Sequence, residues 1–192
     1  GGNMIVQYNT NSRLKVDALA PFDLELSRDR VTDENSEVTF LNPNHSILNY
    51  PNKITQKDFE GWTQERGLYF PDKWSSDFTP ILSMHDKGES PKDGSLLVAK
   101  FGKGYYIYTG LSFFREFPEG VSGAYRLFAN ILSTFAGIAS NSFRSILIRS
   151  ADSVPFNCAI FSAIIVNTAN CAVKAFVEAT PISGPACVYA PA

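Results

Sequence analysis

Histidine and cysteine, which supply many catalytic bases, nucleophiles and zinc ligands, are scarce in this chain of 192 residues, which has two histidines and three cysteines. Its 17 basic and 19 acidic side chains give a net charge of −2, and no segment concentrates lysine and arginine as a phosphate-binding surface does. The longest apolar stretch is far shorter than the roughly 20 residues that cross a bilayer. We therefore expect no nucleic-acid partner and no insertion into a membrane.

The cysteines, Cys158, Cys171 and Cys187, are confined to the C-terminal part of the chain. Their spacings of 13 and 16 residues match no Cys-x-x-Cys motif, and a zinc site would need a further ligand from a distant histidine. One disulfide plus a free thiol is an alternative in a secreted protein. Three small buried or unpaired side chains are the simpler interpretation, so we expect this chain to bind no metal and to need no cofactor.

Charged residues divide the chain into two parts. Only five of the 36 charged side chains lie after residue 139, where alanine, serine, isoleucine and valine dominate. We predict a domain over residues 1–137 and a compositionally distinct tail over residues 138–192. The tail is expected either to be β-rich or to be an irregular product of a shifted reading frame. In the β-rich case the candidate strands are 143–149, 158–166 and 172–178.

The first part carries the clearest structural patterns. Apolar residues recur at helical spacing from about 121 to 135. The runs 95–101 and 105–109 flank Gly102-Lys103-Gly104, which predicts a β-hairpin. Thr55 followed by Asp58 predicts the start of a helix ending near Gln64. Further predicted elements are strands at 4–8, 22–26, 37–41, 67–70 and 79–84 and a charged loop at 28–34. Together these elements indicate an α/β domain with the 121–135 helix packed on one face of a sheet.

Several strings of residues occur in one order that is similar to a known family. They are residues 1–10, 28–34, 51–54, 58–62 with 64–70, and 102–115. They resemble the C-terminal domain of bacterial PIG-L (LmbE-like) family deacetylases, a domain similar to class I glutamine amidotransferases and to the ThuA-like group. The resemblance covers about residues 1–135. It implies the later half of a flavodoxin-like three-layer domain, so we expect the chain to begin within a fold.

The residues that the resemblance would assign to catalysis are missing. An amidotransferase-like fold implies a cysteine nucleophile upstream and a histidine soon after a late strand, but no cysteine precedes Cys158 and the run Gly110–Glu116 has no histidine. A Cys–His mechanism therefore cannot be built, and we expect no catalytic residue. The family's deacetylase domain implies zinc held by a His-x-Asp-Asp motif. His45 and His85 do not reproduce that motif, so zinc is expected only in a deacetylase domain outside this chain.

A polar segment after the strand predicted at 79–84 is the first candidate binding site. His85, Asp86 and Glu89 follow that strand, where α/β folds often place ligand contacts. With Arg115 they would line a crevice and bind a polar ligand such as a sugar. The alternative is an exposed loop whose aspartate and glycine make the turn.

Trp62, Glu65 and Arg66 form the second candidate site. A tryptophan beside a charged pair is typical of a sugar-stacking site or a domain interface. The alternative is that Trp62 belongs to the core and that Glu65 and Arg66 form a solvated edge.

These observations predict a non-catalytic accessory domain of a PIG-L-like N-acetyl-sugar deacetylase. It would pack against the other domains of the same polypeptide or bind carbohydrate. One alternative is an amide hydrolase or amidotransferase-like enzyme that acts through His85, Asp86, Glu89 and Arg115; another is a truncated chain with no selected function. A bacterial periplasmic or secreted location is favoured over a cytoplasmic one.

Overall fold

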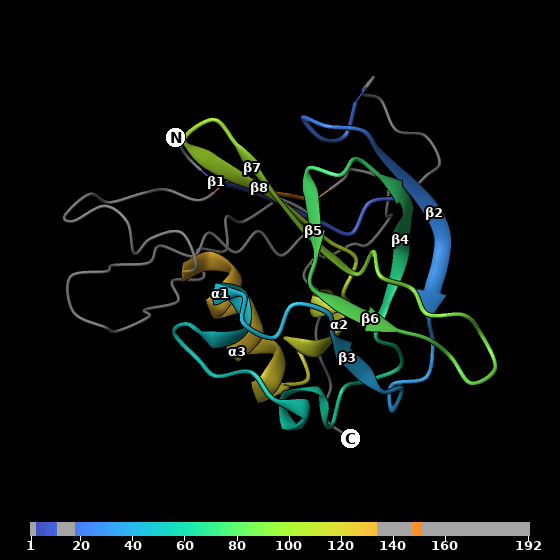
Figure 1. The fold of residues 1–192 in the computed structure, drawn as a ribbon. Helices are drawn as coiled ribbons and strands as arrows, with labels where there is room; N and C mark the ends of the chain where they lie inside the picture. The colour runs from blue at the N-terminus through green and yellow to red at the C-terminus, as the bar shows by residue number, and fades with distance from the viewer. Residues whose placement is uncertain (1–2, 11–17, 134–146, 151–192) are drawn as a thin grey trace, which may run out of the picture.

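The computed structural model describes residues 3–10, 18–133 and 147–150. Its main element is a five-stranded sheet in the order β5-β7-β8-β1-β9 (Figure 1). β1 runs parallel to both β8 and β9, whereas β7 is antiparallel to β8 and to β5. The strands are β1 (Asn3–Gln7), β5 (Phe78–Pro80), β7 (Leu96–Phe101), β8 (Gly104–Thr109) and β9 (Leu147–Ser150).

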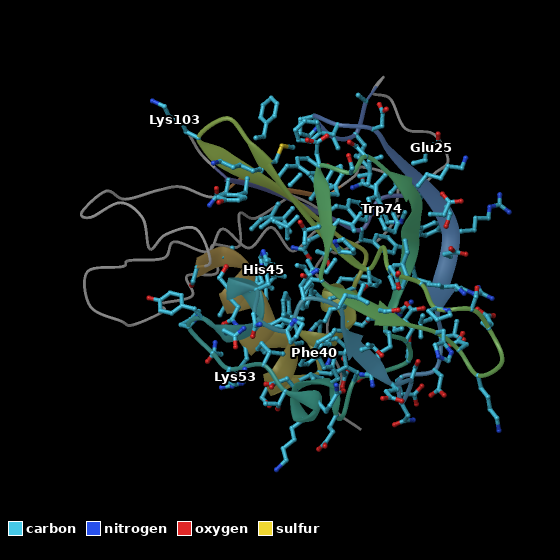
Figure 2. The ribbon with its side chains drawn as sticks, in the orientation of Figure 1. Glu25, Phe40, His45, Lys53, Trp74 and Lys103 are labelled. Carbon is cyan, nitrogen blue, oxygen red and sulfur yellow. The ribbon has the colours of Figure 1, made fainter. Side chains whose placement is uncertain are left out.

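Two antiparallel ribbons and a set of helices surround the sheet. The ribbons pair β2 (Leu24–Val31) with β4 (Gly67–Trp74) and β3 (Val38–Phe40) with β6 (Leu82–Met84). The helices are α1 (Ser46–Asn49), the 3-10 helix η1 (Gln56–Phe59), α2 (Phe113–Glu116) and α3 (Ser122–Ser133). Figure 2 shows Glu25 of β2 and Trp74 of β4 on the side of the molecule away from His45 and Lys53.

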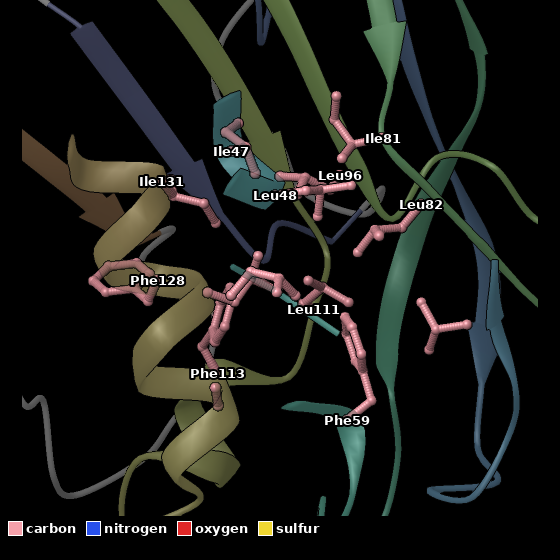
Figure 3. Packing of buried hydrophobic residues seen from close by; sticks show 14 of the residues in the cluster. Ile47, Leu48, Phe59, Ile81, Leu82, Leu96, Leu111, Phe113, Phe128 and Ile131 are labelled. Atoms are coloured by element: carbon pink, nitrogen blue, oxygen red, sulfur yellow. The ribbon is translucent and has the colours of Figure 1, made fainter. Parts of the chain in front are cut away.

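Helix α3 covers one face of the sheet and forms the larger core with it. Leu127 and Ile131 of α3 are fully buried in the same cluster as Ile5 of β1 and Ile107 of β8. Figure 3 shows Ile131 of α3 extending toward Leu48 of α1 and Leu96 of β7, and the Phe128 ring lies 5.3 Å from that of Phe113. The apolar stripe that predicted this helix is therefore the stripe that it buries.

The opposite face of the sheet packs against the β2–β4 ribbon. Leu97 of β7 and Tyr108 of β8 are buried in a second cluster, against which Leu24 and Leu26 of β2 and Trp74 of β4 pack. The sheet thus lies between helices on one face and a β-ribbon on the other. The α/β class expected from the sequence is confirmed, as is a helix packed on one face.

A buried asparagine fastens the loop between α1 and η1 to α3. Asn130 of α3 is fully buried, its Oδ1 accepts from the backbone N–H of Asn52 at 2.9 Å, and its Nδ2 donates to the carbonyls of Ile47 and Asn52 at 2.7 Å each. Nearby, Arg126 of α3 pairs with Asp58 of η1 at 2.6 Å. These hydrogen bonds hold the loop in place, because moving it would leave buried donors and acceptors unpaired and would cost free energy of folding.

Local predictions succeed where a short-range pattern decides the structure. The β7–β8 hairpin is confirmed, with Gly102 at a φ of +56° in its turn, and α3 begins and ends close to its predicted limits. Thr55 does begin η1, and its backbone N–H donates to Asp58 Oδ2 at 2.8 Å. The helix nevertheless ends after one 3-10 turn instead of reaching Gln64, because Gly61 takes a φ of +70°, which ends a helix.

Three predictions about strand limits are wrong. The strand predicted at 79–84 is divided into β5, which pairs with β7, and β6, which pairs with β3. Residues 28–31, predicted as a charged loop, continue β2, because Arg28 and Arg30 point to solvent while Val31 is buried. β4 does not stop before Pro71, because the β2–β4 pairing shifts register there and spares the ring a ladder hydrogen bond. β9 overlaps the strand predicted at 143–149.

Several expectations fall on residues that the structure does not describe. The strands predicted at 158–166 and 172–178, the three cysteines and the boundary near residue 137 all lie outside the described residues. Among the helices that are described, none is long and apolar enough to cross a membrane.

The N-terminal cap of α1 predicts a pH dependence of stability. His45 Nδ1 accepts from the backbone N–H of Ile47 at 3.2 Å, and burial lowers the pKa of His45 below its usual 6.5. Protonation removes the acceptor, so this stabilisation is complete above pH 6.5 and is lost as the pH falls towards the folded-state pKa. We expect urea unfolding between pH 8 and 5 to show a loss of about 1 kcal/mol from this cap.

His45→Asn is the matched control, because asparagine caps a helix without titrating in this range. The exposed His85 is present in both proteins, so it affects both curves alike. Equal pH dependence in the two proteins would contradict a capping role for the imidazole.

Candidate functional site

The carboxyl ends of β1 and β8 bring three distant segments together. The N–H of Tyr8, just after β1, donates to the carbonyl of Thr109 at the end of β8 at 2.9 Å. At the start of β4, the N–H of Leu68 donates to the carbonyl of Gly110 at 2.9 Å. Ligand sites in α/β folds often lie at the carboxyl ends of parallel strands. We therefore place the candidate site here.

Two glycines allow β4 to lie against the turn between β8 and α2. A Cβ at Gly110 would stand 2.7 Å from the carbonyl oxygen of Leu68 and 2.7 Å from the ring of Phe70, and a Cβ at Gly67 would meet the Gly110 carbonyl. Contacts this short are not tolerated, so only glycine fits at this crossing. This close approach places the start of β4, and the residues just before it, beside α2.

An aromatic surface results from this arrangement. The ring centroid of Tyr8 lies 4.8 Å from that of Phe114 and 5.6 Å, edge to face, from that of Tyr69. Phe114 is 42% exposed, and the two tyrosines are half-buried. We call these three residues, Tyr8, Tyr69 and Phe114, the aromatic surface.

A charged pair borders the aromatic surface. Arg115 Nε donates to Glu65 Oε1 at 2.7 Å, and the guanidinium carbon of Arg115 lies 5.0 Å from the centroid of the Phe114 ring. Burial raises the pKa of Tyr8, as do the neighbouring Tyr69 and Glu65, while Arg115 acts in the opposite direction. The Tyr8 hydroxyl therefore lies within electrostatic reach of both members of the pair.

Backbone strain is concentrated around the same surface. Of the described residues other than glycine, three have a positive φ: Tyr8 at 42°, Gln64 at 67° and Tyr69 at 53°. A side chain in this left-handed region costs about 1–2 kcal/mol. Such outliers gather at functional sites, where the surrounding structure holds them in place.

Arg66, next to Glu65 in the chain, has a buried guanidinium. Arg66 is 4% exposed; its Nε and Nη2 donate to the carbonyl of Ser36 at 3.1 and 2.8 Å, and its Nη1 donates to the carbonyl of Phe59. Its guanidinium carbon lies 5.7 Å from the ring centroids of both Phe59 and Trp62. Burial lowers the pKa of Arg66 to about 10, so the side chain stays charged at neutral pH.

The first turn of α2 is tied to this buried group. The Ser112 hydroxyl donates to the carbonyl of Glu65 at 2.6 Å and lies 3.1 Å from Glu116 Oε1, while the N–H of Thr63 donates to Glu116 Oε2 at 2.9 Å. Burial raises the pKa of Glu116, although these hydrogen bonds and the charges of Arg66 and Arg115 oppose the rise. Each of these polar groups has a structural partner, and no cysteine or histidine stands beside Ser112 in the described part of the chain to activate it.

Of the second candidate group, the structure buries all three members. Trp62 is 4% exposed, donates from Nε1 to the carbonyl of Asp58 at 3.0 Å and packs against Phe59 and Phe113. Trp62 is thus a core residue, which was the alternative interpretation. Glu65 and Arg66 are 8% and 4% exposed, so they do not form a solvated edge.

The first candidate group lies on a separate loop. Met84 and Lys92 exchange backbone hydrogen bonds, Gly88 takes a φ of +84°, and Glu89 pairs with Lys92 at 2.6 Å. His85 is exposed. None of the hydrogen bonds or ion pairs formed by the described side chains joins this loop to Arg115.

Asp86 anchors that loop to the end of β2. Its carboxylate accepts from the backbone N–H groups of Thr32 and Asp33 at 2.9 Å and from the Thr32 hydroxyl at 2.8 Å. Partial burial raises the pKa of Asp86, but these hydrogen bonds outweigh it and the net pKa is lowered. Ser36 links the two candidate groups, because its hydroxyl donates to the carbonyl of His85 and its own carbonyl accepts from Arg66.

Comparison with known proteins adds no family: no family model, no curated protein and no solved structure matches the chain. Across the described ranges, no group of three or more His, Cys, Asp or Glu side chains could hold a metal ion. Sequence reasoning missed Tyr8, Tyr69 and Phe114. The available signals were the position of Tyr8 directly after β1 and that of Phe114 next to Arg115, whereas Tyr69, inside β4, carries no such signal.

The strained backbone at Gln64 predicts that glycine is preferred there. Gln64 is exposed, so Gln64→Gly removes the left-handed penalty without removing a buried contact. We expect the free energy of unfolding in urea to rise by about 0.5–1 kcal/mol after allowing for the flexibility of glycine. Thr63→Gly, at the preceding position with ordinary φ, should instead lower it. A destabilised Gln64→Gly protein would show that residue 64 is not strained.

Proposed function

We propose that this chain is a non-catalytic accessory module that binds carbohydrate on the aromatic surface. In this proposal it belongs to a PIG-L-like N-acetyl-sugar deacetylase and derives from the flavodoxin-like, amidotransferase-like domain of that family. The observation that carries the proposal is the partly exposed cluster of Tyr8, Tyr69 and Phe114 at the carboxyl ends of β1 and β8.

The chemistry of the surface suits a sugar ring. A pyranose has an apolar face of C–H groups, which packs on aromatic rings, and an edge of hydroxyls, which needs hydrogen-bond partners. The rings of the aromatic surface supply the first requirement, and the Arg115–Glu65 pair with the two tyrosine hydroxyls supplies the second. Backbone hydrogen bonds hold the surface in place before any ligand arrives, which lowers the entropic cost of binding.

The strings that resemble the PIG-L family contain the residues that build the surface. Tyr8 lies in the string 1–10, Glu65 and Tyr69 lie in 64–70, and Phe114 with Arg115 ends 102–115. This overlap supports linking the surface to the family. The partners would then be the other domains of the same polypeptide, one of which would hold the zinc and perform the amide hydrolysis.

The enzymatic alternative has less support. The Asp86 carboxylate accepts hydrogen bonds from the backbone N–H groups of Thr32 and Asp33. The Glu89 carboxylate pairs with Lys92. Holding a loop in this way accounts for both acidic groups without a substrate.

Isothermal titration with a panel of neutral oligosaccharides tests the proposal. Phe114→Ala should weaken the binding of whichever sugar binds by about fivefold or more, because an exposed stacking ring is removed. Phe101→Ala is the matched control, since Phe101 is also an exposed phenylalanine but lies at the hairpin turn, near the other end of β8. Equal losses in the two variants, or no binding of any sugar or sugar acid at millimolar concentration, would contradict the proposal.

A further inference from the structure

Arg115 brings hydrogen-bond donors to the border of the aromatic surface. Arg115 Nε donates to Glu65, whereas its two terminal nitrogens donate to no described residue. The Arg115 side chain is 35% exposed, so a ligand can reach these nitrogens. The hydroxyls of Tyr8 and Tyr69 likewise bond to no described residue. A ligand that meets this border must therefore supply acceptor atoms.

Glu65 holds the guanidinium in one orientation. Its side chain is 10% exposed, and its Oε1 receives Arg115 Nε at 2.7 Å, while the Phe114 ring lies 5.0 Å from the guanidinium carbon. Held by the carboxylate and the ring, the guanidinium loses little freedom when a ligand binds. Its terminal nitrogens form a planar fork, which matches the two oxygens of a carboxylate.

We propose that the carbohydrate bound here is acidic, a uronate whose ring stacks on the aromatic surface and whose carboxylate is received by the terminal nitrogens of Arg115. This inference rests on the proposed function and names the class of its ligand. Arg115 is the residue that determines specificity, and Glu65 is a positioning residue. Glu65 also repels the anion, so its charge sets an upper limit on affinity.

The test compares two ligands that differ only in the carboxyl group: a trigalacturonate and the matched neutral galactotriose, each titrated into the full chain. We expect the uronate to bind at least about tenfold more tightly at low salt, and high salt to reduce this preference. Arg115→Gln should abolish the preference, with a smaller loss for the neutral sugar, whose hydroxyls lose one hydrogen-bonding partner, and Arg115→Lys should restore only part of the preference.

Glu65→Gln gives a result that a merely structural role would not. A glutamine oxygen can still accept from Arg115 Nε, but the repelling charge is gone, so the preference for the uronate over the neutral sugar should increase. Lys103→Gln removes an exposed cation in the β7–β8 turn, at the end of β8 away from the site, and should change neither. Thermal unfolding of each variant confirms that it is folded.

The outcomes separate the two proposals. Equal binding of both ligands by the wild-type chain overturns the acidic-ligand inference and leaves carbohydrate binding standing. A preference that survives Arg115→Gln in a folded variant overturns the assignment of the carboxylate to Arg115. Binding of neither ligand overturns the acidic-ligand inference, and if the neutral panel also fails, the proposed function falls with it.

Discussion

The buried guanidinium of Arg66 is the constraint on which the arrangement of this domain depends. A charge in a core is stable only when its donors are paired, and here the carbonyls of Ser36 and Phe59 and two aromatic faces surround it. The backbone of the same residue donates to Val31 at the end of β2 and accepts from Ser112 at the start of α2. One residue therefore joins the β2–β4 ribbon, η1, the loop before β3 and the turn after β8.

The candidate site follows from that junction. With residue 66 fixed, its neighbour Glu65 is held against α2, and Arg115 is positioned in turn. Positive φ values at Tyr8 and Tyr69 then bring their rings onto the same surface. The domain tolerates this strain because the large core between α3 and the sheet stabilises the rest of the fold. The product is an aromatic surface bordered by a cation, and it is on this surface that we propose a sugar binds.

The sequence predicted those features that depend on near neighbours. Helical spacing in α3 and the glycine-containing turn of the β7–β8 hairpin act over a few residues, so their patterns are legible. The continuation of β2 through Arg28 and Arg30 could not be predicted from the sequence, because it depends on pairing with β4, about forty residues away. Burial of Glu65 and Arg66 was missed for the same reason: their partners come from the segments at 36, 59 and 112–115. The sequence names Arg115 as a candidate, but the aromatic rings beside it become visible only in the fold.

The free energy of unfolding of Arg66→Met, measured in urea beside Arg30→Met, tests the central role of the buried guanidinium most directly. Both variants replace arginine by the same apolar side chain, but Arg66 is buried with its donors paired, whereas Arg30 is exposed on β2. The account predicts a loss of about 3–5 kcal/mol for Arg66→Met and a change within about 0.5 kcal/mol for Arg30→Met. Similar small changes in both proteins would contradict it.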